Sequence, residues 1–232
     1  MRFLISVPLL AVVTLAAGIA SILTGLVDRG GELPWRLTRG WGRLVLWAWG
    51  VHVVVLGDAA PPRGPVVYAV NHASVLDIPV LFAYLPGSFR IIHKRSLYLL
   101  PLIGLYLYCC GHIGIDRRKA FRARKSLERA ARRIAGGTSV AVFPEGTRSA
   151  DGSVHPFKKG SFVLAIEAGV PVVPVTLAGV KKLAPRGLLR LRPGQLTMTV
   201  HPPLPTAGRV PEEAGALAEQ VRGIVARACA AA

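Results

Sequence analysis

The sequence is poor in cysteine. Its three cysteines, Cys109, Cys110 and Cys229, form no CxxC pair, which argues against a disulfide framework or a zinc site. Unpaired thiols of this kind fit a reducing compartment. The histidines show neither an HxxxH nor an HExxH spacing, so we expect no metal ion and no tightly bound cofactor.

Acidic residues are also scarce. Asp and Glu number 12 against 29 Lys and Arg, which leaves a formal net charge of +17. This balance favours polyanionic partners such as nucleic acid, anionic lipid or phosphorylated substrates. The mean hydropathy of +0.45 is high for a soluble protein and favours an anionic membrane surface. Since no RNA-binding signature accompanies the charge, we expect no nucleic acid partner.

Charge is absent altogether from residues 3–27. A helix of this length would extend roughly 37 Å, compared with about 30 Å for the hydrocarbon core of a bilayer. The segment can therefore cross a membrane with tilt, or bend and re-enter near Pro8 or Gly18. A cleaved signal peptide ending near residues 18–20 is the competing interpretation, but the apolar run continues to Val27 and favours an anchor.

The charges that flank this segment predict its orientation. Only Arg2 precedes it, whereas Arg29, Arg36, Arg39 and Arg43 follow, so the positive-inside rule places the rest of the chain on the cytoplasmic face of the cell membrane.

Residues 41–56 hold three of the four tryptophans and predict either a second helix against lipid or a buried helix followed by a strand. We expect a membrane-anchoring helical segment at 1–56 and a separate domain at 57–232.

The remainder of the chain alternates between strand and helix patterns. Short β-rich runs occur at 66–70, 89–94, 139–143, 170–177 and 196–200, and helical periodicity occurs at 118–135 and 211–230. This alternation predicts an α/β fold with a mixed sheet flanked by helices, preceded by an apolar membrane helix or helix pair.

A histidine and a carboxylate follow the first of these strands in the segment Asn71–Asp77, NHASVLD. If His72 lies in the loop and Asp77 in the first turn of the next helix, Asp77 can accept a hydrogen bond from one ring nitrogen and fix the tautomer. The alternative is a loop histidine and a helix-starting aspartate without a joint role. Ser74 suggests a hydrolase nucleophile, but no GxSxG elbow is present.

A second polar loop, FPEGTRS at 143–149, follows the strand at 139–143. Pro144 and Gly146 end the strand, which leaves Glu145, Thr147 and Arg148 displayed on a loop. A guanidinium in this position suits capture of a phosphate, and a polar turn with a solvated arginine is the alternative. A third segment, GHIGIDRR at 111–118, places Arg117 where an apolar stretch ends.

The order of these motifs resembles a known family. NHxxxxD, GxIxxxR, FPEGTRS and a Val/Pro-rich strand at 170–175 are similar to the glycerolipid acyltransferases typified by 1-acyl-sn-glycerol-3-phosphate acyltransferase, over roughly residues 65–180. The resemblance implies that His72 is a general base oriented by Asp77. It implies a substrate-binding role for Asn71, Arg117, Glu145, Gly146, Thr147, Arg148 and Pro174. Gly114 departs from the family, which usually has a bulkier residue there.

The same resemblance implies a reaction. A fatty acyl group passes from a thioester of coenzyme A or acyl carrier protein to a lysophospholipid hydroxyl, with the sn-2 hydroxyl of 1-acyl-sn-glycerol-3-phosphate as the expected acceptor and phosphatidic acid as the product. The coenzyme A or carrier thioester is a co-substrate, and a bilayer containing anionic lipid is the expected partner. Another lyso-lipid acceptor, such as a lyso-amino-acid lipid, and a non-enzymatic basic membrane-binding protein are the alternatives.

Overall fold

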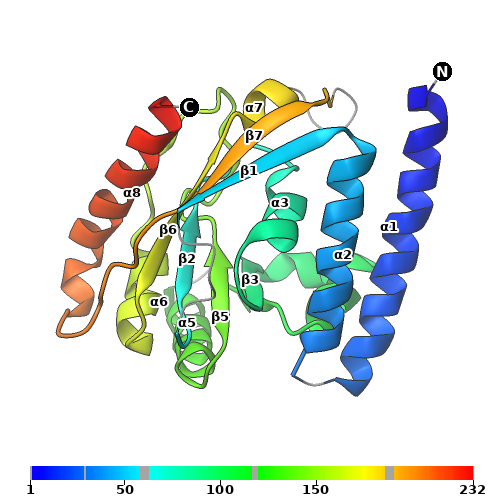
Figure 1. The fold of residues 1–232 in the computed structure, drawn as a ribbon. Helices are drawn as coiled ribbons and strands as arrows, with labels where there is room; N and C mark the ends of the chain where they lie inside the picture. Colours follow the sequence, from blue (N-terminus) through cyan, green and yellow to red (C-terminus); the bar gives the residue numbers. More distant parts are fainter. Residues whose placement is uncertain (1, 29, 58–62, 117–119, 186–190, 232) are drawn as a thin grey trace.

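The computed structural model describes residues 2–28, 30–57, 63–116, 120–185 and 191–231. The chain opens with two helices that pack side by side, α1 (Arg2–Val27) and α2 (Glu32–Ala48) (Figure 1). Residues Leu10–Val27 of α1 are long and apolar enough to cross a membrane. The predicted apolar helix is therefore present, and it is one member of a helix pair.

The described residues form one sheet of seven strands, in the order β1-β7-β6-β2-β5-β3-β4. Strands β2, β3, β4, β5 and β6 are parallel to one another. Strand β7 is antiparallel to β6, and β1 is parallel to β7, so the sheet is mixed as predicted. Their bounds are β1 (Val51–Gly57), β2 (Val67–Val70), β3 (Phe89–Lys94), β4 (Ile113–Ile115), β5 (Ser139–Val142), β6 (Val172–Ala178) and β7 (Gly194–Val200).

Helices cover both faces of the sheet (Figure 1). The others are α3 (Asp77–Tyr84), α4 (Ile103–Cys109), α5 (Ala120–Ala135), α6 (Gly160–Ala168), α7 (Val180–Leu183) and α8 (Ala214–Ala230), with short 3₁₀ turns η1 (Arg95–Leu99) and η3 (Pro211–Glu213). Along β2, Tyr68 packs toward the core under α3 and Ala69 toward the core under α6 and α8. A strand covered on both faces is apolar throughout, which explains the continuous run VVYAV.

The tryptophan-rich segment at 41–56 is a helix followed by a strand. Helix α2 ends at Ala48, Gly50 takes a positive φ of 63°, and β1 then pairs with β7. The interpretation as a second lipid-facing helix through residue 56 is therefore wrong. Since β1 belongs to the sheet, the division predicted after residue 56 falls inside a strand.

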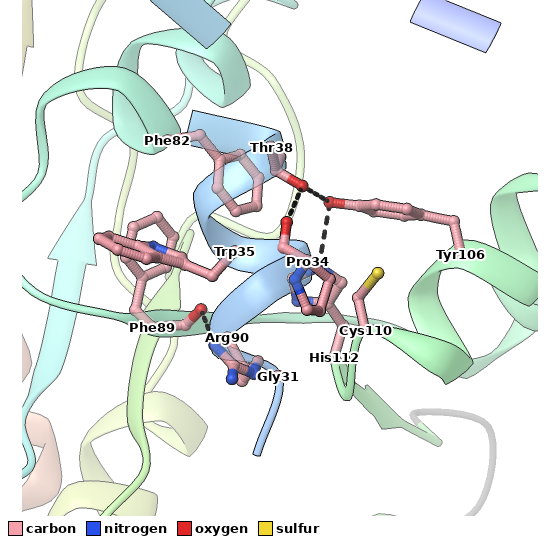
Figure 2. A pocket seen from close by; sticks show the side chains of 10 residues that line it. All are labelled: Gly31, Pro34, Trp35, Thr38, Phe82, Phe89, Arg90, Tyr106, Cys110 and His112. Carbon is pink, nitrogen blue, oxygen red and sulfur yellow. Dashed lines mark hydrogen bonds between the residues drawn. The ribbon is translucent and has the colours of Figure 1, made fainter. Parts of the chain in front are cut away.

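A buried polar junction holds α2 and α4 against the sheet (Figure 2). The hydroxyls of Thr38 and Tyr106 lie 3.0 Å apart and join the two helices. Arg90 of β3 is buried and donates to the carbonyl of Gly30 at 2.6 Å, so it ties the turn between α1 and α2 to the sheet. Burial, with the charge of Arg90, lowers the pKa of His112 in this junction to about 3, so His112 is neutral.

Candidate active site

The centre of the candidate site is a hydrogen bond between His72 and Asp77. His72 lies in the loop after β2, and Asp77 is the first residue of α3. His72 Nδ1 is 2.6 Å from Asp77 Oδ2. Because a carboxylate only accepts, Nδ1 donates and Nε2 is left as the basic nitrogen. The His72 side chain is 19% exposed and that of Asp77 0%, so the imidazole is accessible from outside while the carboxylate is not.

The Asp77 carboxylate is itself fixed in place. Its Oδ2 also accepts the main-chain N–H groups of Ala73 at 2.8 Å and Ser74 at 2.9 Å. The first turn of a helix favours a negative charge, so α3 adds to the stabilisation of this carboxylate. The predicted placement of His72 in the loop and Asp77 at the helix start is confirmed.

The loop at 143–149 contacts His72 through two hydrogen bonds and one ring stack. The carboxylate of Glu145 accepts the His72 main-chain N–H at 2.7 Å, and the Ser149 main-chain N–H donates to the His72 carbonyl at 2.8 Å. The ring of Phe143 stacks on the imidazole, with centroids 4.0 Å apart and planes inclined by 24°. The two motifs, far apart in the sequence, therefore form one site.

The Glu145 side chain points into the protein. It is buried, and its second carboxylate oxygen accepts the main-chain N–H of His155 at 3.2 Å. Burial raises the pKa of Glu145, and the two main-chain N–H groups offset only part of that effect. The side chain clamps the loops together. The sequence predicts an exposed Glu145, because the sequence alone does not distinguish a buried loop carboxylate from an exposed one.

The outward side of the same loop carries the free polar groups. Gly146 has a φ of 79° and closes a turn in which its N–H donates to the carbonyl of Phe143 at 3.0 Å. Thr147 and Arg148 follow and are exposed. Within the described ranges, the Arg148 guanidinium has no hydrogen-bond or ion-pair partner, so it is available to an anion.

Both polar groups of the Asn71 side chain form hydrogen bonds within the protein. Its side-chain amide donates to the Leu177 carbonyl at 3.0 Å and accepts the Leu177 N–H at 2.8 Å. This pair continues the main-chain pairing of β2 with β6 by one further step and sets the direction of the chain into His72.

The other predicted residues lie elsewhere. Pro174 is buried within β6 opposite Ala69, in the body of the sheet. Arg117 lies outside the described residues. The hydroxyl of Ser74 accepts the Leu76 N–H at 3.2 Å in a buried position, which makes it a turn-stabilising group and a poor nucleophile.

Comparison with known proteins identifies the family to which this chain belongs. The family model described as Acyltransferase matches residues 52–178, more than half of the chain. The chain belongs to the acyltransferase family. The match begins in β1 and ends with β6, and it includes both loops of the candidate site.

Individual members of the acyltransferase family are also similar to this chain. A 1-acyl-sn-glycerol-3-phosphate acyltransferase of Chlamydomonas reinhardtii is 45% identical over 156 residues, which are 66% of this chain and 47% of the relative. The alpha form of that enzyme from Homo sapiens is 37% identical over 180 residues, 77% of this chain and 64% of the relative. The chain thus spans about half to two thirds of the length of these relatives.

A solved structure shows the same fold. The crystal structure of the 1-acyl-sn-glycerophosphate (LPA) acyltransferase PlsC from Thermotoga maritima superposes with a TM-score of 0.77 at 27% identity, and the match covers 99% of this chain and 96% of the other.

The surroundings of Gly114 leave no room for a side chain. A Cβ at Gly114 would clash with Cε2 of the Tyr98 ring. The Tyr98 hydroxyl donates to the His112 carbonyl at 2.8 Å and accepts the Gly114 N–H at 3.2 Å. Tyr98 therefore fills the space that a larger residue at 114 would take.

Proposed function

We propose that this chain transfers a fatty acyl group from an acyl thioester to the sn-2 hydroxyl of 1-acyl-sn-glycerol-3-phosphate, which yields phosphatidic acid. The observation that carries the proposal is the His72–Asp77 pair, in which Nδ1 and Oδ2 are 2.6 Å apart. The 143–149 loop contacts His72 and holds it in place. The names of the relatives support the choice of acceptor.

The pair suits direct acyl transfer. Nε2 of His72 takes the proton of the acceptor hydroxyl as the oxygen attacks the thioester carbonyl. The new C–O bond forms, the C–S bond breaks, and the imidazolium returns the proton to the departing thiolate. Asp77 stabilises the imidazolium between these steps. A base of this kind contributes about 10²–10⁴-fold to the rate.

The acceptor is held by its phosphate in this proposal. Arg148 and Thr147 offer a guanidinium and a hydroxyl on the outer side of the loop that contacts His72. Arg117 lies outside the described residues, and its share in phosphate binding is proposed from the sequence motif alone. Binding energy from the phosphate, remote from the reacting carbon, holds the hydroxyl near the base. Glu145 and Asn71 act as positioning residues, since their polar atoms are engaged by main chain.

A membrane location accompanies this function. Besides the apolar α1, helix α2 exposes Leu33, Leu37, Leu44 and Trp47 on one face, where a soluble protein would place polar residues. We therefore propose a membrane-anchoring segment over residues 1–50 and a catalytic domain over 51–232 on the cytoplasmic face, with the boundary placed before β1.

The test is product identification. Membranes containing the protein are supplied with labelled acyl-coenzyme A or acyl carrier protein and a panel of lyso-lipids. Labelled phosphatidic acid from the lysophosphatidate arm, above membranes lacking the protein, is the expected result. Transfer only to another lyso-lipid would change the acceptor, and transfer to none of them, by folded protein, would contradict the proposal. The two donor arms distinguish coenzyme A from the carrier.

A further inference from the structure

The hairpin formed by η1 and α4 presents an unusual surface. Seven large apolar side chains are exposed on it, with Leu99 80% and Tyr108 74% exposed, and the remainder are Leu97, Leu100, Leu102, Ile103 and Leu105. An open groove of about 390 Å³ runs among them, between Tyr98 and Tyr108. We call these seven side chains the hairpin surface. An exposed apolar cluster of this kind marks a contact with another apolar body.

The hairpin surface is rigidly mounted. Tyr106, on the inner side of α4, joins Thr38 of α2 (Figure 2), and Tyr98 at the base of the hairpin bonds to the main chain around β4. The exposed side chains therefore lie on an element whose inner side is firmly bound to the core.

The backbone is strained where the hairpin turns. Leu102 has φ 60° and ψ −53°, the only positive φ of a non-glycine residue in the described ranges. The Ile103 N–H donates across it to the Pro101 carbonyl at 2.6 Å, which closes a tight γ-turn. Such conformations cost free energy and cluster at functional sites. Here the strain places an exposed leucine at the tip.

The hairpin surface adjoins the apolar segment of α1. A Cβ at Gly25 would lie 2.5 Å from the Cys109 carbonyl oxygen, and the Cys110 thiol donates to the Ser21 carbonyl at 3.6 Å. Ser21 and Gly25 lie inside the segment Leu10–Val27 that is apolar enough to cross a membrane. An element packed against that segment shares its depth in the bilayer.

Positive charge borders the hairpin surface. Arg95 begins η1, and Arg133 of α5 lies near enough to act electrostatically on the Tyr98 hydroxyl, as Arg95 does. An apolar centre with a basic rim matches the acyl and headgroup layers of an anionic bilayer. A protein partner would not require the shared depth with α1.

We propose that the hairpin surface is a second membrane-inserting element, which enters an anionic bilayer beside α1 and fixes the orientation of the catalytic domain on the membrane. This inference rests on the membrane location in the proposed function. It assigns to the strained hairpin the task of bringing the site to the lipid surface where the acceptor resides.

Photocrosslinking tests the insertion. A benzophenone amino acid replaces Leu99 in the full chain, in vesicles of phosphatidylcholine and phosphatidylglycerol. Leu23 of α1, 59% exposed, is the positive control, and Val210, just before η3 and α8 and 51% exposed, is the negative control. Helix α8 and helix α1 lie at opposite edges of the molecule in Figure 1. Lipid adducts at 99 and 23, at least five-fold above 210, are expected. Adducts at 23 with only background at 99 would overturn the inference, as would crosslinking of 99 to a protein in native membranes.

A charge substitution separates membrane docking from catalysis. Leu99→Glu is expected to raise the apparent KM for vesicle-embedded lysophosphatidate several-fold and to leave the rate on a short-chain, water-soluble acceptor unchanged, whereas Val210→Glu changes neither. Equal KM values for Leu99→Glu and the parent on vesicles would overturn the inference. If neither Leu23 nor Leu99 labels lipid while acyl transfer persists, the membrane placement fails and the catalytic proposal stands.

Discussion

The imidazole of His72 and the phenyl ring of Phe143 lie stacked, with centroids 4.0 Å apart. One ring comes from the loop after β2 and the other from the end of β5, and these strands are neighbours in the sheet. Together with the Asp77 bond on one edge of the imidazole, the stack fixes both the plane and the direction of the ring. The loop that displays Arg148 thus also supports the proposed base.

Replacing Phe143 by leucine tests the stack. An aromatic pair contributes about 0.5–1.5 kcal/mol beyond area burial, so we expect kcat to fall roughly 2- to 13-fold as the imidazole gains freedom. The KM for acceptor should change little, because the phosphate contacts remain. Steady-state kinetics on protein with unchanged circular dichroism gives the measurement. A rise in KM with constant kcat would indicate that Phe143 contacts substrate instead.

Replacing Glu145 tests its role as a clamp. Glu145→Ala removes the acceptor of the His72 and His155 N–H groups, which lie in partly buried hydrogen bonds. An unpaired buried N–H costs about 1–3 kcal/mol, so partly buried groups should cost up to that amount each. Glu145→Gln keeps one acceptor and should retain more stability and more activity than Glu145→Ala. Both losses are expected in unfolding free energy and kcat. A selective loss of acceptor affinity by either variant, at full stability, would return Glu145 to a phosphate-binding role.

Replacing Arg148 tests the phosphate site. The side chain is exposed, so Arg148→Ala should leave the unfolding free energy within about 0.5 kcal/mol and raise the KM for a phosphorylated acceptor. Arg148→Lys keeps the charge and loses the planar fork, so it should be intermediate. Arg132→Ala on the exposed face of α5 is the matched control. An unchanged KM in Arg148→Ala would remove the proposed role.

His112 predicts a stability loss in acid. Burial, then the charge of Arg90, lowers its pKa to about 3, and its Nδ1 accepts the Ile91 N–H at 3.0 Å. An unfolded histidine titrates near 6.5, so between about pH 6.5 and 3 the unfolded chain binds one more proton at this residue than the folded protein does. The free energy of unfolding therefore decreases as the pH is lowered through this range. The loss is about 1.4 kcal/mol at pH 5.5.

Denaturant unfolding at pH 7.5 and 5.5 measures that loss. His112→Gln should reduce the difference in unfolding free energy between the two pH values, whereas His52→Gln, at an exposed position on β1, should not. Identical pH dependence in His112→Gln and the parent protein would refute the assignment.

Much of this arrangement could be predicted from sequence. Asn71 through Asp77 and the 143–149 loop follow strong apolar strands, and parallel neighbours bring their ends to one edge of the sheet. Strand β4 was not predicted, because three residues show no alternation. Strand β1 was ambiguous with a helix, because an apolar run next to tryptophans carries no clear period.

The direction of side chains within the loops could not be predicted. Glu145 and Arg148 are three residues apart in one polar turn, yet Glu145 is buried and Arg148 exposed. Which of them turns inward depends on main-chain N–H groups of His72 and His155, which are contacts remote in sequence. The pairing of Asn71 with Leu177 and the packing of Tyr98 on Gly114 are likewise tertiary contacts without a local signal.

The most direct test of the account is the acyl-transfer rate of His72→Ala under single-turnover conditions, with saturating thioester and lysophosphatidate and folding verified by its thermal transition. The account predicts that the rate falls by about 10²–10⁴-fold, since the imidazole that receives the hydroxyl proton is gone. A rate within three-fold of the parent protein, from an equally stable variant, would contradict the assignment of His72 as the base.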